Sequence, residues 1–387
     1  MNAHRIPDPA STHPLAEWLA TQESGLRPEV IGGLARDARI VGLGMSTRAA
    51  REVFDVVTDA TWRLLDSGFT TIAVLDDQCV VDRYDRYVIG QDIDIDQALA
   101  QAWGPWRIAE LRRMLDRLRA RNEAHPEAPV RVIGIAGTRV LVTDYDRIVE
   151  LLTGLDARAA AEVQALLDLI RPAHDSGEHV LRARGNHPGV PFVDLARSAR
   201  AIASRLRPSA ERDTAVDLLD AVVGFHANAI GVGYDMAREE RAAARRLLDH
   251  HRRTGARIVL WEGSAHVAAH PGPMLGAHLR DTLGDGYVAV HITFGHGRIV
   301  TGDIPAPQTD SIDAQLAAAH DPRTLDLRTP APASIAVELE RSWPTRLISG
   351  LYDPAEDAEH YLELPSLRDS FDALVYVPAI TPTESLG

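Results

Sequence analysis

The 387-residue chain contains no lysine, so all 41 of its basic residues are arginines. Catalysis through a Schiff base on a lysine is therefore excluded. The single cysteine, Cys79, rules out an intramolecular disulfide and a cysteine-based metal site. No stretch approaches the length of a membrane span, and Met1–Pro14 lacks the apolar core of a secretory signal. We expect a cytoplasmic protein without a membrane partner.

Positive charge is also scarce relative to negative charge. The formal net charge is −14, with 45% hydrophobic and 25% charged residues, as in ordinary soluble proteins. Nucleic acids and anionic membranes need basic patches, so neither is an expected partner. The sequence has no phosphate-binding P-loop, no dinucleotide-binding glycine motif and no Gly-x-Ser-x-Gly elbow. Histidine pairs such as His250–His251 lack carboxylates at metal-ligand spacing, so we expect neither a metal nor a cofactor.

Short apolar runs alternate with amphipathic segments, a pattern typical of α/β proteins. It predicts one domain over residues 1–387, with a mostly parallel sheet flanked by helices. From 144 to 249 the pattern is helical throughout, which indicates a large helical insertion. The expected strands are Ile40–Leu43, Thr71–Leu75, Val130–Ile135, Arg257–Trp261, Tyr287–Ile292 and Leu374–Val377. The expected helices are Ala50–Leu65, Ala98–Asn122, Leu151–Ile170, Val193–Leu206, Thr214–Asn228 and Tyr234–His251, and Asp303–Pro332 is expected to be a loop-rich connection.

The most informative segment is Ile40–Glu52, which reads as a buried strand, a tight turn and the start of a helix. Glycines at 42 and 44 allow the tight exit from the strand, and Met45–Arg48 form the turn. Ligands of open α/β sheets bind in the crevice beyond the carboxyl ends of the strands. The segment therefore predicts a binding or active site at this turn.

This frame resembles the erythromycin esterase family, whose version reads Gly-Glu-x-x-His-Gly-x-Arg-Glu. Other segments follow in the family's order over nearly the whole chain. They are Gly68–Gly90, Trp103–Arg107 with Glu110, Asp235–Ala237, Ile258–Val267, Gly286–Gly297 and Phe371–Tyr376. The resemblance implies the family's fold and a small-molecule substrate. It also suggests that the helical insertion roofs the pocket.

The chain departs from the family at the positions that carry acid–base chemistry. The family's first glutamate falls on Met45, its general-base histidine on Arg48 and its second glutamate on Leu75. In the family's His-Asn-x-His motif, Gly263 and Ser264 replace the first two residues, and only the last histidine remains, as His266. Because an arginine cannot deprotonate water at neutral pH, we do not expect ester hydrolysis by the mechanism that the resemblance implies.

Five residues are the candidates for catalysis. A guanidinium at Arg48 suits an anionic or oxyanionic group, although an ion pair with Asp76 or Asp77 would explain it equally well. These two carboxylates follow the second strand and point in opposite directions, so only one faces the site. His266 is the strongest acid–base candidate because histidine titrates near neutrality, with a hydrogen-bonded structural role as the alternative. Glu262 either supplies a carboxylate or faces solvent.

A second group of residues is expected to bind substrate or to shape the pocket. Met45 and Leu75 make the site drier, and Trp106 and Ser264 belong to the matching motifs. Arg51, Glu52 and Arg86 are kept from the family frame and either orient site groups or form structural ion pairs. His226 lies in the helical insertion, where it is either part of the core or part of the roof.

Three hypotheses about function follow. The first is an enzyme that tailors a specialised metabolite, derived from a polyketide or a peptide, by cyclisation, elimination or isomerisation through Arg48 and His266. The second is a hydrolase with a rearranged water-activating network, and the third is a pseudoenzyme that only binds a small molecule. The first is favoured because the changes concentrate on the catalytic carboxylates and histidines, while the glycines, Arg51 and Glu52 stay.

Overall fold

The central strand β1 (Ile40–Met45) is buried along its whole length and lies between β4 and β5, both parallel to it. The computed structural model describes residues 13–137, 140–171, 190–228, 235–349 and 352–386. Its main sheet runs in the order β3-β2-β4-β1-β5-β10-β7, with β6 paired to β5. Only β6 and β7 are antiparallel to their neighbours. The other strands are β2 (Thr71–Val74), β3 (Arg131–Gly134), β4 (Ile258–Gly263), β5 (Tyr287–Ile299), β6 (Gly302–Ile304), β7 (Arg323–Asp326) and β10 (Ala373–Ile380).

Successive side chains of β1 point to opposite faces of the sheet, as in any strand, and they pack in two separate cores. Val41, Leu43 and Met45 point into one core, and Ile40 points into the other. Both faces of the parallel sheet are thus covered, which is the usual arrangement for parallel sheets. The first core is closed by α2 (Pro28–Leu34), α3 (Arg51–Asp66), α4 (Gln78–Val88), α5 (Ile95–Ala100), the 3-10 turn η1 (Gly104–Trp106) and α6 (Ala109–Ala124).

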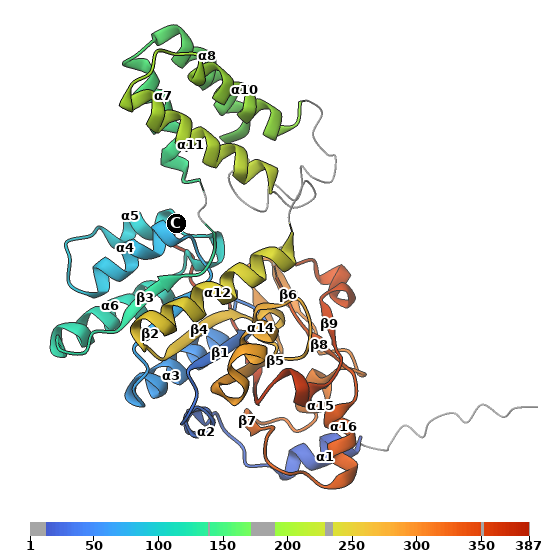
Figure 1. Ribbon diagram of the computed structural model, residues 1–387. Coiled ribbons are helices and arrows are strands. Elements are labelled where there is room, and N and C mark those ends of the chain that lie inside the picture. Colours follow the sequence, from blue (N-terminus) through green and yellow to red (C-terminus); the bar gives the residue numbers. More distant parts are fainter. Residues whose placement is uncertain (1–12, 138–139, 172–189, 229–234, 350–351, 387) are drawn as a thin grey trace, which may run out of the picture.

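The second core is closed by helices from the beginning, middle and end of the chain. Figure 1 shows α12 (Met236–Thr254) crossing in front of the sheet, and Ala244 and Leu247 of this helix share the second core with Leu260 of β4. The remaining helices on this side are α1 (Pro14–Thr21), α13 (Ser264–Val267), α14 (Leu275–Leu283), α15 (Ile312–Ala317), α16 (Ala333–Glu340) and α17 (Leu367–Ser370). A separate hairpin of β8 (Trp343–Arg346) and β9 (Tyr361–Leu364) lies beside α15, and the short 3-10 turns η3 (Gly284–Gly286) and η4 (Pro354–Glu359) complete the α/β body.

The predicted α/β class and mostly parallel sheet are confirmed, with differences in detail. Every expected strand is present, and β5 is longer than predicted. The expected helix Ala98–Asn122 is divided into α5, η1 and α6, since Pro105 cannot continue a helix. The connection Asp303–Pro332 was expected to be loop-rich, but it contains α15 and β7. The hairpin β8–β9 was not predicted.

The helical insertion forms a bundle of its own. Its helices are α7 (Val142–Thr153), α8 (Ala157–Ile170), α10 (Phe192–Ser204) and α11 (Ala210–Ala227). They share an apolar core that includes Tyr145, Leu167 and Leu219, and Figure 1 shows them stacked above the α/β body. The predicted insertion extended to 249, but α12 belongs to the α/β body because its apolar face packs on the sheet. The expected helix Leu151–Ile170 breaks at Gly154, between α7 and α8.

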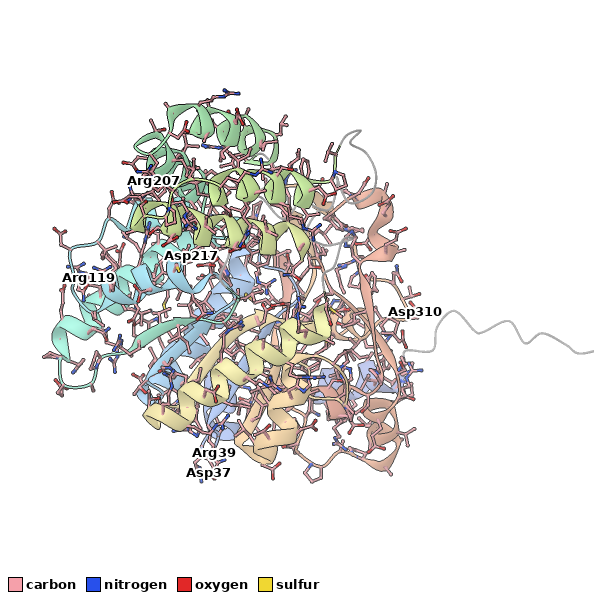
Figure 2. All side chains as sticks on the ribbon, turned by 45° about the horizontal axis from the view of Figure 1, so that its top comes forward. Asp37, Arg39, Arg119, Arg207, Asp217 and Asp310 are labelled. Atoms are coloured by element: carbon pink, nitrogen blue, oxygen red, sulfur yellow. The ribbon has the colours of Figure 1, made fainter. Side chains whose placement is uncertain are left out.

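Charged side chains of both signs are spread over the surface. Figure 2 shows Arg207 and Asp217 on the helical bundle, with Arg119, Asp37 and Asp310 on the α/β body. Among the described residues, no helix is both long and apolar enough to cross a membrane.

Candidate active site

Arg48 and Glu262 meet where the carboxyl ends of β1 and β4 lie side by side. Glu262 is the fifth residue of β4 and pairs in register with Gly44 of β1, and Arg48 follows in the turn before α3. Arg48 Nη2 forms an ion pair with Glu262 Oε2, which also accepts a 2.8 Å hydrogen bond from the backbone N–H of Gly263. The side chains are only 10% and 2% exposed. This is a desolvated ion pair at the edge of the sheet where ligands of such folds bind.

Two indole rings lie close to the Arg48 guanidinium. Its Cζ atom lies 5.0 Å from the ring centroid of Trp103 and 5.7 Å from that of Trp106, within the range of cation–π attraction. Burial lowers the pKa of Arg48 to about 10, so the side chain remains a cation at neutral pH. Its Nε atom is buried and has no hydrogen-bond partner among the described residues. Within the part of the chain that the structure describes, this donor is therefore both unpaired and shielded from solvent.

His266 lies on the one-turn helix α13, directly after β4, and is held between two carboxylates. Its Nδ1 atom is 2.8 Å from Glu240 Oε1, and its Nε2 atom is 3.7 Å from Glu262 Oε1. The other oxygen of Glu240 accepts a 2.9 Å hydrogen bond from the backbone N–H of Leu275. A carboxylate only accepts hydrogen bonds, so Nδ1 of His266 carries the donated proton. The Nε2 atom then faces Glu262, with the imidazole 29% exposed.

Arg48, Glu262 and His266 therefore belong to one cluster, as the sequence predicts. Gly263 lies between them, because a Cβ atom there would be 3.3 Å from His266 Cδ2 and 3.5 Å from Arg48 Nη2. A side chain at 263 would crowd both the cation and the imidazole. Glycine at this position therefore keeps the space between the two functional groups free.

Asp76 and Asp77 fix the neighbouring loop. The buried carboxylate of Asp76 accepts hydrogen bonds from the backbone N–H groups of Trp103 (3.1 Å) and Asp77 (2.8 Å), with Tyr84 Oη at 3.5 Å. Asp77 caps α4 by accepting from the backbone N–H of Cys79. Asp76 thus holds in place the segment whose indole lies over Arg48. Among the described residues, the ion-pair partner of Arg48 is Glu262, whereas the sequence suggested Asp76 or Asp77.

The other expected pocket residues fall into two groups, of which the first lies close to the cluster. Met45 is 1% exposed and packs in the first core, and Trp106 Nε1 donates a 2.7 Å hydrogen bond to the carbonyl of Leu75. The hydroxyl of Ser264 turns inward to Nδ1 of His291, at 2.8 Å. These residues line the turns that carry Arg48 and His266.

The second group makes contacts with other parts of the fold. Arg51 lies 3.6 Å from the buried carboxylate of Glu110, and Glu52 accepts hydrogen bonds from Thr381 near the C-terminus. Arg86 Nε donates to Gln91. His226 is buried in the helical bundle, with Nε2 at 3.5 Å from Tyr145 Oη and its ring against Phe225.

Glu240 is a functional residue that the sequence patterns do not indicate. It lies three residues after the matching segment Asp235–Ala237 and outside it. Glu240 reaches His266 from α12, 26 positions earlier in the chain, and no local spacing indicates such a contact. Among the described residues, no group of three His, Cys, Asp or Glu side chains could hold a metal ion.

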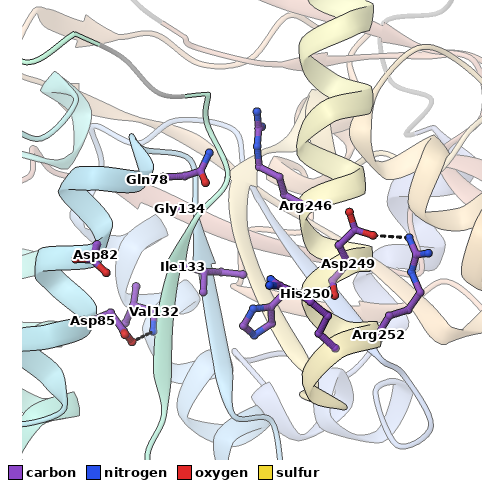
Figure 3. Close-up of a pocket in the computed structure, with 11 residues that line it drawn as sticks. Gln78, Asp82, Asp85, Val132, Ile133, Gly134, Arg246, Asp249, His250 and Arg252 are labelled. Atoms are coloured by element: carbon purple, nitrogen blue, oxygen red, sulfur yellow. Dashed lines mark hydrogen bonds and ion pairs between the residues drawn. The ribbon is translucent and has the colours of Figure 1, made fainter. Parts of the chain in front are cut away.

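A separate pocket opens at the free edge of β3. Figure 3 shows it between α4, which carries Asp82 and Asp85, and α12, which carries Arg246 and His250. Its volume is about 700 Å³, and the described residues that line it do not include Arg48, Glu262 or His266. Asp85 accepts a hydrogen bond from the outward backbone N–H of Val132, which blocks pairing of another strand at this edge.

One family model matches the chain, and solved structures share its fold. The model of the family described as erythromycin esterase matches residues 65–380. A Bacillus cereus protein of solved structure is 19% identical with a TM-score of 0.67, and the match covers 97% of this chain and all of the other. A succinoglycan biosynthesis protein is 17% identical (TM-score 0.62), with 96% and 98% of the two chains covered. A mutant of the erythromycin esterase EreC in its open conformation is 15% identical (TM-score 0.58), with coverages of 94% and 98%. At such identities the structural matches establish the fold alone, and no curated protein sequence matches the chain.

Proposed function

Because this chain belongs to the erythromycin esterase family, we propose that it is an acid–base enzyme that acts on a carbonyl group of a small molecule. His266 is the acid or base, and Arg48 binds the oxyanion or anion of the substrate. The observation that carries the proposal is the hydrogen bond between His266 Nδ1 and Glu240. An imidazole fixed through Nδ1 by a carboxylate presents Nε2 in a defined orientation, which is the arrangement that catalytic histidines use.

Hydrolysis is the reaction that this geometry supports best. The sequence alone favours a non-hydrolytic step, because the changes from the family frame concentrate on its catalytic carboxylates and histidines. Glu240 supplies a carboxylate for His266, and the partly exposed imidazole can take a proton from water. Arg48, already desolvated beside two indoles, can stabilise the tetrahedral oxyanion through the charge of its guanidinium. Glu262 balances the charge of Arg48 and orients it.

A non-hydrolytic tailoring step remains the second candidate. The buried Met45, the Leu75–Trp106 contact and the two indoles make the surroundings of Arg48 apolar, which favours chemistry that excludes water. A cyclisation, elimination or isomerisation of a polyketide or peptide-derived metabolite would use the same proton transfer through His266.

We also propose that the helical bundle roofs the pocket. The chain leaves the α/β body for the bundle after β3 and returns at the start of α12, which runs antiparallel to the strands. Both connections therefore emerge at the carboxyl edge of the sheet, the edge that carries Arg48 and His266. In Figure 1 the bundle lies above the α/β body, and this position is consistent with a roof over the carboxyl edge of the sheet.

The test is a screen of the purified chain against macrolide lactones, depsipeptides and simple carboxylic esters in water enriched in ¹⁸O. Hydrolysis places one heavy oxygen in the acid product, whereas a non-hydrolytic step yields a product without it. Turnover that is lost in His266→Ala supports the proposal in either case. Turnover that His266→Ala leaves unchanged contradicts it.

A further inference from the structure

A series of fully buried polar side chains runs away from the active site past His291, in the first half of β5. Ser264 of α13, His291 of β5, Thr345 of β8 and Asp313 of α15 are each no more than 1% exposed. Ser264 Oγ lies 2.8 Å from His291 Nδ1, and His291 Nε2 lies 2.9 Å from Thr345 Oγ1. Thr345 Oγ1 lies 3.4 Å from Asp313 Oδ1. Four groups from four elements thus form a continuous series, although buried polar groups are costly unless each is satisfied.

Asp313, the last residue of the series, determines which atom donates and which atom accepts in each of its hydrogen bonds. The carboxylate of Asp313 accepts hydrogen bonds from Thr293, from Thr345 and from the backbone N–H of Arg346. Since Thr345 donates its proton to Asp313, its oxygen accepts the Nε2–H of His291. The lone pair on Nδ1 of His291 then accepts the hydroxyl proton of Ser264. This arrangement needs a neutral imidazole, and burial lowers the pKa of His291 to about 3.

The near end of the series is the helix that carries His266. Ser264 is the first residue of α13 and His266 the third, and a single backbone bond from Ala268 N to Ser264 O (3.1 Å) closes the turn. At the other end of α13, Tyr287 Oη donates a 2.7 Å hydrogen bond to the carbonyl of Val267. A one-turn helix has little stability of its own. Its orientation therefore depends on such tertiary contacts.

We propose that His291 is a positioning residue for His266 and acts through Ser264 and α13. Thr345 and Asp313 fix the tautomer of His291, and this tautomer holds the Ser264 hydroxyl. Ser264 in turn sets the orientation of α13, so that Nδ1 of His266 meets Glu240. The inference rests on the proposed function in one respect, that His266 is the acid or base. The ring of His291 stacks on Phe371 at 4.8 Å, which keeps the imidazole itself from rotating.

The experiment measures the titration and the Nδ1–H signal of His266 by side-chain ¹⁵N NMR of the full chain. The His266 signals are assigned as those missing from the spectrum of His266→Gln. Ser264→Ala removes one hydroxyl, Thr345→Val removes the acceptor of His291 with little change in volume, and His291→Phe keeps the stacked ring. Each should shift the titration midpoint of His266 by about half a pH unit or more and weaken its Nδ1–H signal, with circular dichroism unchanged. His250→Asn, a change on α12 that leaves the series intact, should do neither.

A His266 titration that stays unchanged in folded Ser264→Ala and Thr345→Val proteins overturns the inference, even if His291→Phe fails to fold. With a substrate in hand, the same variants should lower kcat roughly tenfold and leave KM nearly unchanged. The proposed function fails independently, when wild-type and His266→Ala proteins react equally. The NMR result does not depend on that outcome.

Discussion

The Nδ1 atom of His266 lies 2.8 Å from Glu240 Oε1, while the second oxygen of Glu240 accepts the backbone N–H of Leu275. Both partners of the carboxylate are therefore donors. A neutral amide in its place could satisfy only one of them, because its NH₂ group donates as well. The charge of Glu240 thus determines which nitrogen of His266 carries the proton.

Glu240→Gln should consequently lower turnover by about 10²-fold or more, within the usual range of general acid–base catalysis. It should lower the free energy of unfolding by about 1–3 kcal/mol, the cost of leaving a buried donor unsatisfied. Steady-state rates and denaturant unfolding measure the two effects. Glu239→Gln, one residue away and more exposed, is the control and should change neither. Equal turnover of the Glu240 variant and the wild type would argue against the dyad.

Arg48 and Glu262 should be coupled in stability. Arg48→Met leaves the buried Glu262 carboxylate without its cation and should cost about 3–5 kcal/mol. The double variant Arg48→Met/Glu262→Gln should cost less than the sum of the single variants, as a double-mutant cycle by urea unfolding will measure. Additive costs would mean that the ion pair contributes nothing.

Arg48→Lys separates function from stability. It keeps the charge but loses the planar guanidinium that pairs with Glu262. Turnover should therefore fall far more than the unfolding midpoint does. A variant that loses both in proportion would assign Arg48 to structure alone.

Gly44 is required by packing. A Cβ atom there would lie 2.9 Å from Ser264 Cα and would overlap with Val267, so Gly44→Ala should displace α13 and destabilise the fold by about 1–3 kcal/mol. The control is Gly224→Ala in α11, where nothing lies within 4 Å, and it should stabilise the protein by up to about 1 kcal/mol. Thermal unfolding of the two variants should therefore shift in opposite directions, and a neutral Gly44→Ala would contradict the close approach of α13.

Asp313 should make stability depend on pH. Burial raises its pKa from 3.8 to about 6, so the folded state binds its proton more tightly than the unfolded state does. The stabilisation is complete below about pH 4 and is lost as the pH rises through about 6, at no more than about 1.4 kcal/mol per pH unit. Relative to Asp313→Asn, the wild type should therefore lose stability between about pH 4 and pH 6. The exposed Asp310→Asn is the control, and a difference independent of pH would refute the raised pKa.

Macrolide lactones should be opened only in traces. The general-base position implied by the family frame holds Arg48, and His266 lies at a different position of the site. A base that is not at the family's position forgoes the usual contribution of about 10²–10⁴-fold to opening this lactone. Mass spectrometry of erythromycin after incubation measures the product, and robust hydrolysis would mean that His266 replaces the missing base even for this substrate.

The parts of this structure that follow from local patterns were predictable from the sequence. The apolar strands around Ile40, Thr71 and Ile258 are continuous runs, and parallel strands end at a common edge, so the meeting of Arg48, Glu262 and His266 could be anticipated. The hairpin β8–β9 could not, because Trp343–Arg346 contains a proline and alternates only weakly. The role of Glu240 could not be predicted from the sequence for a different reason. Its contact depends on how α12 packs across the sheet, and no spacing in the chain encodes that distance.

The most direct measurement is the turnover of His266→Ala on any substrate that the wild type converts, with His251→Ala as the control. The imidazole is partly exposed and its loss leaves Arg48, Glu262 and the two indoles in place. We predict a loss of about 10²–10⁴-fold in kcat, with substrate binding still detectable by calorimetry. The free energy of unfolding should fall by no more than about 1–3 kcal/mol, because Glu240 loses its imidazole donor. Full activity of the folded His266→Ala protein would contradict the account, because the proton transfer would then lie elsewhere in the molecule.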